Sequence, residues 1–141
     1  MNRTGCRGKS CRDYLCDELF SNKRPAYERY DANKIVITNL PESGITGIYA
    51  IFYASEVIYV GKSDTDIRKR ILSHLNFWGK QRIDGHFRVQ PDDLRKLRHY
   101  SISYVKVKNP TCEEHNYIDC IAKKQNKWPE FNDIKGNAQC K

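Results

Sequence analysis

Two short segments rich in β-branched and aromatic residues constrain the fold of this chain most strongly. Gly47–Tyr53 reads GIYAIFY and residues 57–60 read VIYV, and three residues separate the two segments. Residues of this kind favour strands, and so short a connection is typical of an antiparallel hairpin. The sequence therefore predicts a β-hairpin in the middle of the chain, with Gly61 closing its second strand.

A helix is expected directly after the hairpin. Asp64 or Asp66 can cap a helix that runs to about Asn76. Apolar residues recur there at the spacing of one helical face, namely Ile67, Ile71, Leu72 and Leu75.

Shorter patterns predict the remaining elements. β-branched residues indicate a strand at 34–38, and alternation of polar and apolar residues indicates a half-buried strand at 100–108. Residues 13–19 and 92–97 are expected to form short helices, and residues 77–89 a loop.

A longer helix is predicted near the C-terminus. Thr111 is placed at its N-cap, with Glu114 three residues later to complete a capping box, and the helix reaches Lys124. The order hairpin, helix, helix, strand, helix indicates an α+β fold. We expect a small central antiparallel sheet of about three strands, hairpin first, flanked by helices.

The chain is short and basic. Its 141 residues suit one domain, and 25 Lys and Arg against 17 Asp and Glu give a net charge of +8. That balance favours a polyanionic partner. No apolar run approaches the roughly 20 residues that cross a bilayer, so no membrane association is expected.

Six cysteines occur without an apolar N-terminal signal segment, which indicates a reducing cytoplasmic or nucleoid-associated location with mostly free thiols. Cys112 and Cys120 stand about two helical turns apart, as small buried apolar residues commonly do. Cys6, Cys11 and Cys16 are each five apart, a spacing unlike that of zinc ligands.

Five residues could take part in catalysis or in binding of a phosphate or a metal ion, judging by their types and spacing. Tyr49 and Tyr59 lie on the two hairpin strands, so a short loop can bring both hydroxyls to one end of the sheet. Arg70 and His74 are four apart and share a helix face, where Arg can grip a phosphate and His can move a proton. Glu114 can hold Mg²⁺ through one oxygen. Each pattern also has a structural explanation: strand packing, a solvated basic face and helix capping.

Together these segments resemble the GIY-YIG nuclease superfamily. Residues 47–49 (GIY) followed by 59–61 (YVG) are similar to its two-part signature, with Val60 in place of Ile. Residues 61–74 are similar to the stretch that leads into the family's arginine-bearing helix. The fold that the resemblance implies is the GIY-YIG nuclease fold over residues 41–141, with residues 1–40 as an N-terminal extension.

Two later segments continue the resemblance. Residues 114–118 (EHNYI) resemble the metal-binding glutamate segment, especially that of excision-repair incision subunits. Residues 129–132 (PEFN) resemble the closing Pro-x-aromatic-Asn. The interval between Glu114 and Asn132 is longer than usual, with residues 123–127 as the extra segment.

The resemblance implies an endonuclease that hydrolyses phosphodiester bonds in double-stranded DNA. Tyr49 would be the general base, with Tyr59 left open as the alternative. Arg70 would hold the scissile phosphate, and Tyr59 and His74 would orient water or relay a proton. Lys62, Arg70 and a bound metal would lower the pKa of the tyrosine base.

The resemblance also implies a single divalent cation, Mg²⁺ or Mn²⁺. Glu114 would bind it, and the cation would stabilise the departing oxyanion. Asn132 would hold the residues that contact the substrate in place without contacting the substrate itself.

Positive charge is concentrated between residues 62 and 100, where ten Lys and Arg stand against five Asp, interleaved with aromatic residues. The loop 77–91 and residues 1–40 are the expected sources of target selection, and cutting of both strands would imply a homodimer. The expected substrate-binding residues are Lys62, Arg68, Lys69, Lys80 and Arg82.

The length favours a stand-alone restriction-type or phage-type endonuclease, with the nuclease domain of a repair or homing enzyme as an alternative. Two alternatives come from other classes: a basic nucleic-acid-binding module that does not cut, and a zinc-stapled interaction domain.

Overall fold

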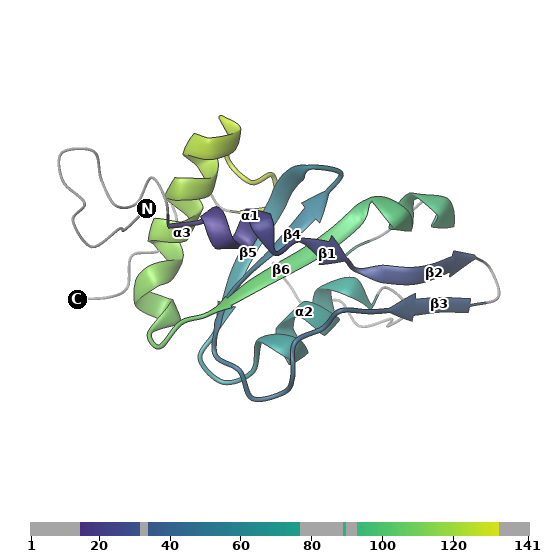
Figure 1. Ribbon diagram of the computed structural model, residues 1–141, viewed down its shortest axis with the longest axis horizontal. Helices are drawn as coiled ribbons and strands as arrows, with labels where there is room; N and C mark the ends of the chain where they lie inside the picture. The colour runs from purple at the N-terminus through teal and green to yellow at the C-terminus, as the bar shows by residue number, and fades with distance from the viewer. Residues whose placement is uncertain (1–14, 32–33, 77–88, 90–92, 133–141) are drawn as a thin grey trace.

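The computed structural model describes residues 15–31, 34–76, 89 and 93–132 (Figure 1). In chain order its elements are α1 (Asp17–Ser21), β1 (Arg24–Pro25), β2 (Tyr27–Asp31), β3 (Lys34–Ile37), β4 (Gly47–Tyr53), β5 (Glu56–Ser63), α2 (Ile67–Leu75), the 3₁₀ helix η2 (Leu94–His99), β6 (Tyr100–Lys106) and α3 (Pro110–Gln125).

The strands form two antiparallel sheets. The larger has the order β1-β6-β4-β5, and β2 and β3 form a separate two-stranded ribbon. The predicted α+β class, with an antiparallel sheet flanked by helices, is confirmed. The prediction of about three strands is wrong, because the described residues form six. The two-residue β1 and the charged β2 carry too weak an alternation to be recognised in the sequence.

The predicted hairpin is β4 and β5. Gly47 pairs with Ser63 at its open end and Tyr53 with Glu56 at its turn, so β5 is longer than the predicted strand. Ala54 occupies the turn with a left-handed φ of 58°. β6 pairs with β4 along its whole length, which places β4 at the centre of the sheet.

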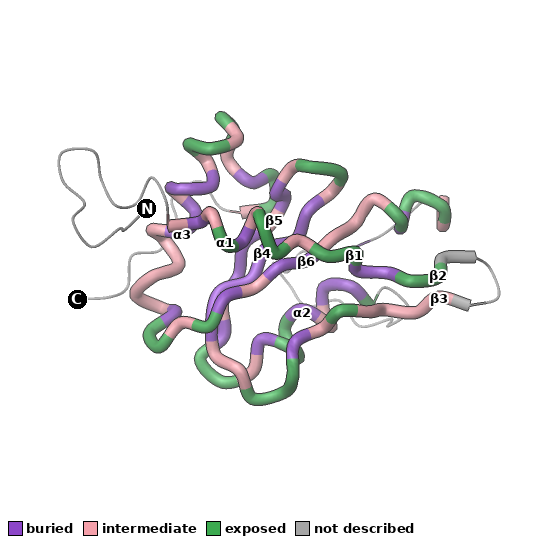
Figure 2. Tube along the Cα trace, in the orientation of Figure 1, coloured by how far each residue is buried: buried purple, intermediate pink, exposed green. Residues whose placement is uncertain are grey.

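Alternate residues of β4 point into two cores on opposite faces of the sheet. Ile48, Ala50 and Phe52 pack with α1 and α3. Tyr49 and Ile51 pack with α2, η2 and β2. The helices therefore lie on both sides of the sheet (Figure 1), and buried residues run along the central strands (Figure 2).

The helix after the hairpin forms as predicted. The carboxylate of Asp66 caps α2 by accepting from the backbone N–H groups of Arg68 and Lys69, at 3.1 and 3.4 Å. Ile67, Ile71 and Leu75 are buried, and Leu72 is half-buried.

The capping box predicted at Thr111 is wrong. α3 begins two residues earlier, with Pro110 in its first turn and Asn109 at the N-cap without a side-chain hydrogen bond. Proline suits this position because its missing N–H would have no partner there. Thr111 and Glu114 are therefore free of capping roles.

The other predicted elements shift by a few residues. The short N-terminal helix occupies Asp17–Ser21, and the second short helix is the 3₁₀ helix η2. The predicted strand at 34–38 ends at Ile37, and the strand at 100–108 ends at Lys106.

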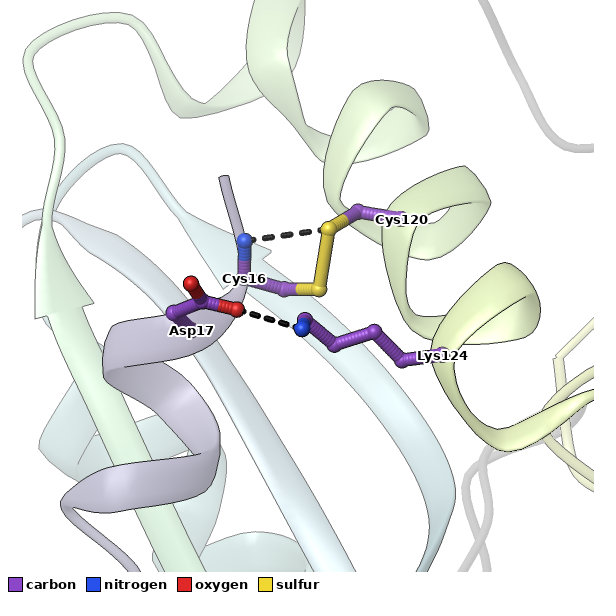
Figure 3. Close-up of a disulfide and its surroundings, with 4 residues drawn as sticks. All are labelled: Cys16, Asp17, Cys120 and Lys124. Carbon is purple, nitrogen blue, oxygen red and sulfur yellow. Dashed lines mark hydrogen bonds and ion pairs between the residues drawn. A yellow bond between two sulfur atoms is a disulfide. The ribbon is translucent and has the colours of Figure 1, made fainter. Parts of the chain in front are cut away.

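The expectation of free thiols is wrong for the described cysteines. Cys16, just before α1, forms a disulfide with Cys120 of α3, with the two Cα atoms 5.9 Å apart (Figure 3). Cys112 is also disulfide-bonded. A cysteine held in a disulfide offers no thiolate to zinc, so these three residues do not support the zinc-stapled alternative.

The described part of the N-terminal extension packs against the sheet. Cys16 and Leu19 are fully buried in the core under α3, and Arg24 and Pro25 pair with β6. Among the described residues, no helix is long and apolar enough to cross a membrane.

Candidate active site

Three aromatic side chains predicted to act together meet on the α2 face of the sheet. Tyr49 comes from β4, Tyr59 from β5 and His74 from α2. The ring centroids lie 4.8 Å apart for Tyr59 and His74, 5.7 Å for Tyr49 and His74, and 6.3 Å for the two tyrosines. The Tyr49 hydroxyl and His74 Nε2 are 2.8 Å apart, within hydrogen-bond distance. The hairpin register and the helix spacing together produce this cluster.

The two glycines of the GIY and YVG segments make room for this arrangement. Gly61 lies directly opposite Tyr49 in the hairpin. A Cβ atom at Gly61 would overlap the Tyr49 phenol, and one at Gly47 would overlap the Val105 carbonyl of β6. Both positions need glycine because of close approach.

Burial dominates the electrostatics of Tyr49, whose side chain is fully inaccessible to solvent. Loss of solvation raises the pKa of the Tyr49 phenol far above its usual value, and Tyr59 raises it further. The nearby Arg70 guanidinium opposes both effects through its charge and a hydrogen bond. Arg70 therefore acts in the expected direction, and without a metal ion burial outweighs it.

The basic residues of α2 differ in their surroundings. Arg68, Lys69 and Arg70 are all exposed. Arg68 donates to the Pro41 carbonyl at 2.9 Å, so it holds the loop between β3 and β4 against α2. Two other expected substrate-binding residues, Lys80 and Arg82, and the loop 77–91 except for Val89 lie outside the described residues.

Lys62 stands at the end of β5 in a polar network with Asp64 and Thr111, to which the sequence patterns assign only helix-capping roles. Its Nζ lies 3.1 Å from Asp64 Oδ2 and 2.7 Å from Thr111 Oγ1. The Thr111 hydroxyl in turn donates to Asp64 Oδ2 at 2.9 Å. Asp64 and Thr111 are 47 residues apart, so no local pattern could have revealed the pairing.

Glu114 lies close to this network and to Arg70. Burial raises the pKa of its carboxyl group, Asp64 adds to the rise, and the charges of Lys62 and Arg70 oppose it. The carboxylate is thus half-buried and lies near two cationic side chains. A divalent cation could take the place of these side chains as its partner.

The donor set fits a magnesium-like ion held by one protein carboxylate. Within the described parts of the chain, no three His, Cys, Asp or Glu side chains gather closely enough to form a metal cage. Mg²⁺ is commonly held through one or two carboxylates, with water and substrate phosphate completing its shell. Glu114 would hold such an ion.

Asn132 lies where it can hold the Tyr59–Gly61 segment in place. Its side-chain oxygen accepts from the Val60 N–H at 2.8 Å, and its side-chain nitrogen donates to the Val60 carbonyl at 2.9 Å. Gln125 makes the same pair of hydrogen bonds with Val57, at 2.9 and 3.0 Å. These two amides replace a neighbouring strand along the outer edge of β5. No pattern in the sequence indicates this role for Gln125.

A cavity of about 560 Å³ lies away from this cluster, along the edge of β6 that β1 leaves uncovered. Glu18, Leu40 and Tyr104 are among its lining residues, and none of the predicted catalytic residues lines it. We place the candidate site at the Tyr49 cluster, because chemistry requires reactive groups and this cavity contains none of the residues predicted to react.

Comparison with protein-family models, with curated proteins and with solved structures finds no match for this chain.

Proposed function

We propose that this protein is a divalent-metal-dependent endonuclease of the GIY-YIG type that hydrolyses phosphodiester bonds in double-stranded DNA. The observation that carries the proposal is the convergence of Tyr49, Tyr59, Arg70, His74 and Glu114 from β4, β5, α2 and α3. These residues are far apart in the sequence, and packing alone does not require this combination of a base, a phosphate-binding cation and a metal-binding carboxylate.

The proton path runs through Tyr49 and His74. Burial raises the pKa of Tyr49 and so favours its protonated phenol, and we infer that Tyr49 passes its own proton on as it accepts one from water. Neutral His74 can take that proton at Nε2, across the 2.8 Å contact. Once substrate binding admits a water molecule beside the Tyr49 hydroxyl, that water loses a proton to the Tyr49 oxygen, and the resulting hydroxide attacks phosphorus.

Tyr59 has the better access to solvent. It is partly exposed, whereas Tyr49 and His74 are fully buried. Tyr59 can therefore orient the attacking water at the surface of the cluster. Tyr59 is the alternative general base in case the attacking water contacts its hydroxyl and not that of Tyr49.

Arg70 and Glu114 act on the phosphate side. Arg70 is exposed on α2 and can hold the non-bridging oxygens of the scissile phosphate. The ion bound by Glu114 would stabilise negative charge on the leaving oxygen as the P–O bond breaks. Lys62 and Arg70 keep Glu114 in a cationic environment that also favours binding of the DNA backbone.

Two neighbouring glutamates on α3 provide a matched test. Glu114→Gln removes the metal-binding charge, whereas Glu113→Gln removes the same charge one residue away. We expect the Glu114→Gln variant to bind a duplex oligonucleotide in Mg²⁺ without cutting it. The Glu113→Gln variant should cut the same duplex at close to the wild-type rate.

The same experiment separates the competing proposal of a non-cleaving nucleic-acid-binding module. A binding module would bind the duplex without cutting it in Mg²⁺ or Mn²⁺, and both glutamine variants would bind it equally. The exposed basic residues of α2 are the feature that favours this alternative.

Cutting of both DNA strands would require two active sites, and we propose a homodimer for that purpose. We propose a restriction-type or phage-type enzyme, with the nuclease domain of a repair or homing enzyme as the alternative. The sizes of the plasmid fragments would distinguish it from a repair or homing nuclease, because a restriction-type enzyme recognises a short sequence and therefore gives discrete fragments.

A further inference from the structure

The network of Lys62, Asp64 and Thr111 connects three elements at the edge of the candidate site. Lys62 lies in β5, Asp64 in the turn before α2, and Thr111 in the first turn of α3. The three polar contacts measure 2.7, 2.9 and 3.1 Å. The network therefore joins the ends of the elements that carry Tyr59, Arg70 and Glu114.

The hydrogen-bond capacities of the three groups are well matched. The Thr111 hydroxyl accepts from Lys62 and donates to Asp64, so it is used in both directions. The Lys62 ammonium has three N–H donors, and these two contacts use two of them. One donor is left for another oxygen atom.

Stability alone is a weak reason for this network. The Lys62 and Asp64 side chains are 31% and 54% exposed. Ion pairs this exposed contribute little to folding and restrict a flexible lysine side chain. Restriction is useful, however, where a cation must already be in place when a charged ligand arrives.

The network lies beside the proposed metal ligand. Both Lys62 and Asp64 are close enough to Glu114 for their charges to shift the pKa of its carboxyl group, Lys62 downward and Asp64 upward. Thr111 stands three residues before Glu114, and residues three apart on a helix lie on the same face. The oxygen atoms nearest to Lys62 in a bound complex would therefore be those of a phosphate at Glu114.

We propose that Asp64 and Thr111 are positioning residues that hold the Lys62 ammonium beside Glu114, where it contacts a phosphate oxygen of the substrate. This inference rests on the proposed nuclease function. Asp64 and Thr111 act through Lys62 and do not themselves touch the DNA.

A double-mutant cycle tests the inference. Thr111→Val removes the hydroxyl at nearly constant shape, Thr111→Ser restores it, and Lys62→Met removes the ammonium. Asp93→Asn serves as the control, because Asp93 forms a similar exposed pair with Arg95 on η2. Single-turnover cutting of a duplex oligonucleotide in Mg²⁺ and binding of the same duplex without metal are measured for each variant.

We expect Thr111→Val to slow cutting roughly tenfold to a hundredfold, because small displacements of a positioned group have effects of that order. Duplex binding should change much less, Thr111→Ser should recover most of the rate, and Asp93→Asn should behave as wild type. In the Lys62→Met background, Thr111→Val should have little further effect, because its target is gone.

Additive losses would overturn the inference. If Thr111→Val slows cutting as much without Lys62 as with it, Thr111 supports α3 and does not position Lys62. A loss that Thr111→Ser fails to recover would lead to the same conclusion.

Failure of the proposed function would be visible separately. If the wild-type protein cuts no DNA in Mg²⁺ or Mn²⁺, the nuclease proposal fails, and with it the role of Lys62 in the reaction. A crystal structure of the wild-type protein then tests the network alone: Lys62 Nζ within hydrogen-bond distance of Thr111 Oγ1 supports the contact, and a separated pair overturns it.

Discussion

At the scale of single residues, the environment of Tyr49 explains most of the candidate site. Its ring lies against Gly61, its hydroxyl bonds His74, and Arg70 approaches it from α2. The hydroxyl is buried, so any proton that it accepts must leave through a protein group. His74 is the partner in position to receive it.

Replacement of Tyr49 by phenylalanine tests the relay. We expect cutting to fall by at least about a hundredfold, since general acid–base groups contribute on that order. The free energy of unfolding should fall by about 1–3 kcal/mol, because His74 Nε2 loses a buried hydrogen-bond partner. Plasmid cutting and urea unfolding measure the two effects.

Tyr53→Phe is the matched control, since Tyr53 lies on the same face of the same strand but outside the cluster. It should cut at the wild-type rate. A Tyr49→Phe variant that cuts as fast as this control would show that Tyr49 is not in the proton path, and Tyr59 would then be the base.

Glu114 gives the site a pH dependence. Its carboxyl pKa is raised in the folded protein, mainly by burial. The folded state therefore binds its proton more tightly than the unfolded state does, whose pKa is about 4.3. Between the two pKa values, the free energy of unfolding of the metal-free protein should fall as pH rises.

The carboxylate must also lose its proton to bind a cation. Metal-dependent cutting should therefore have an acid limb above the ordinary glutamate range, and added Mg²⁺ should move that limb to lower pH. Urea unfolding between pH 4 and 7 in EDTA should show less pH dependence for Glu114→Gln than for Glu113→Gln. Identical profiles for the two variants would contradict the raised pKa.

At the scale of elements, the outer edge of β5 is the feature that ties the fold to the site. Side-chain amides of Gln125 and Asn132 pair with Val57 and Val60, and the Phe131 N–H donates to the Ile58 carbonyl at 2.9 Å. A strand edge is thereby covered without a further strand.

The two amides make a matched pair of substitutions. Gln125→Ala and Asn132→Ala each leave a backbone N–H and carbonyl at the strand edge without their partner, so each should lower the free energy of unfolding by about 1–3 kcal/mol. Asn132→Ala should in addition slow cutting, because Val60 lies between Tyr59 and Gly61. Equal rates for the two variants would show that Asn132 has only a structural role.

Local patterns predicted the elements well, and long-range contacts explain what they missed. The hairpin and α2 depend on neighbouring residues, so strand composition and helical spacing were enough. The central position of β6, by contrast, depends on pairing between residues about 50 positions apart. Thr111 illustrates the same limit. Its sequence context favours a helix N-cap, but in the folded chain its hydroxyl accepts from Lys62 and donates to Asp64.

At the scale of the whole molecule, the N-terminal segment is fastened to the helix that carries Glu114. The disulfide between Cys16 and Cys120 links residues 104 apart, and Lys124 Nζ lies 2.6 Å from Asp17 Oδ1 beside it (Figure 3). α3 is thus held near its C-terminal end by the disulfide and near its start by Thr111.

Removal of this disulfide should destabilise the whole domain. Cys16→Ala with Cys120→Ala should lower the free energy of unfolding by about 2–5 kcal/mol, because a cross-link closing so long a loop restricts the unfolded chain. Lys124→Ala should cost only about 0–1 kcal/mol, since its ion pair is partly exposed. Urea unfolding measures both.

A reducing agent is an independent control for the disulfide. Dithiothreitol should destabilise the wild-type protein by at least as much as the double substitution does. A double variant as stable as wild type under non-reducing conditions would contradict a structural role for the cross-link.

The most direct test of the central claim is a time course of supercoiled plasmid with the wild-type protein in Mg²⁺, beside the same reaction in EDTA. The account predicts conversion to nicked and linear DNA in Mg²⁺ and none in EDTA, with the Glu114→Gln variant inactive in both. Plasmid that stays supercoiled in Mg²⁺ and in Mn²⁺ while the protein binds it would contradict the claim that this chain is a nuclease.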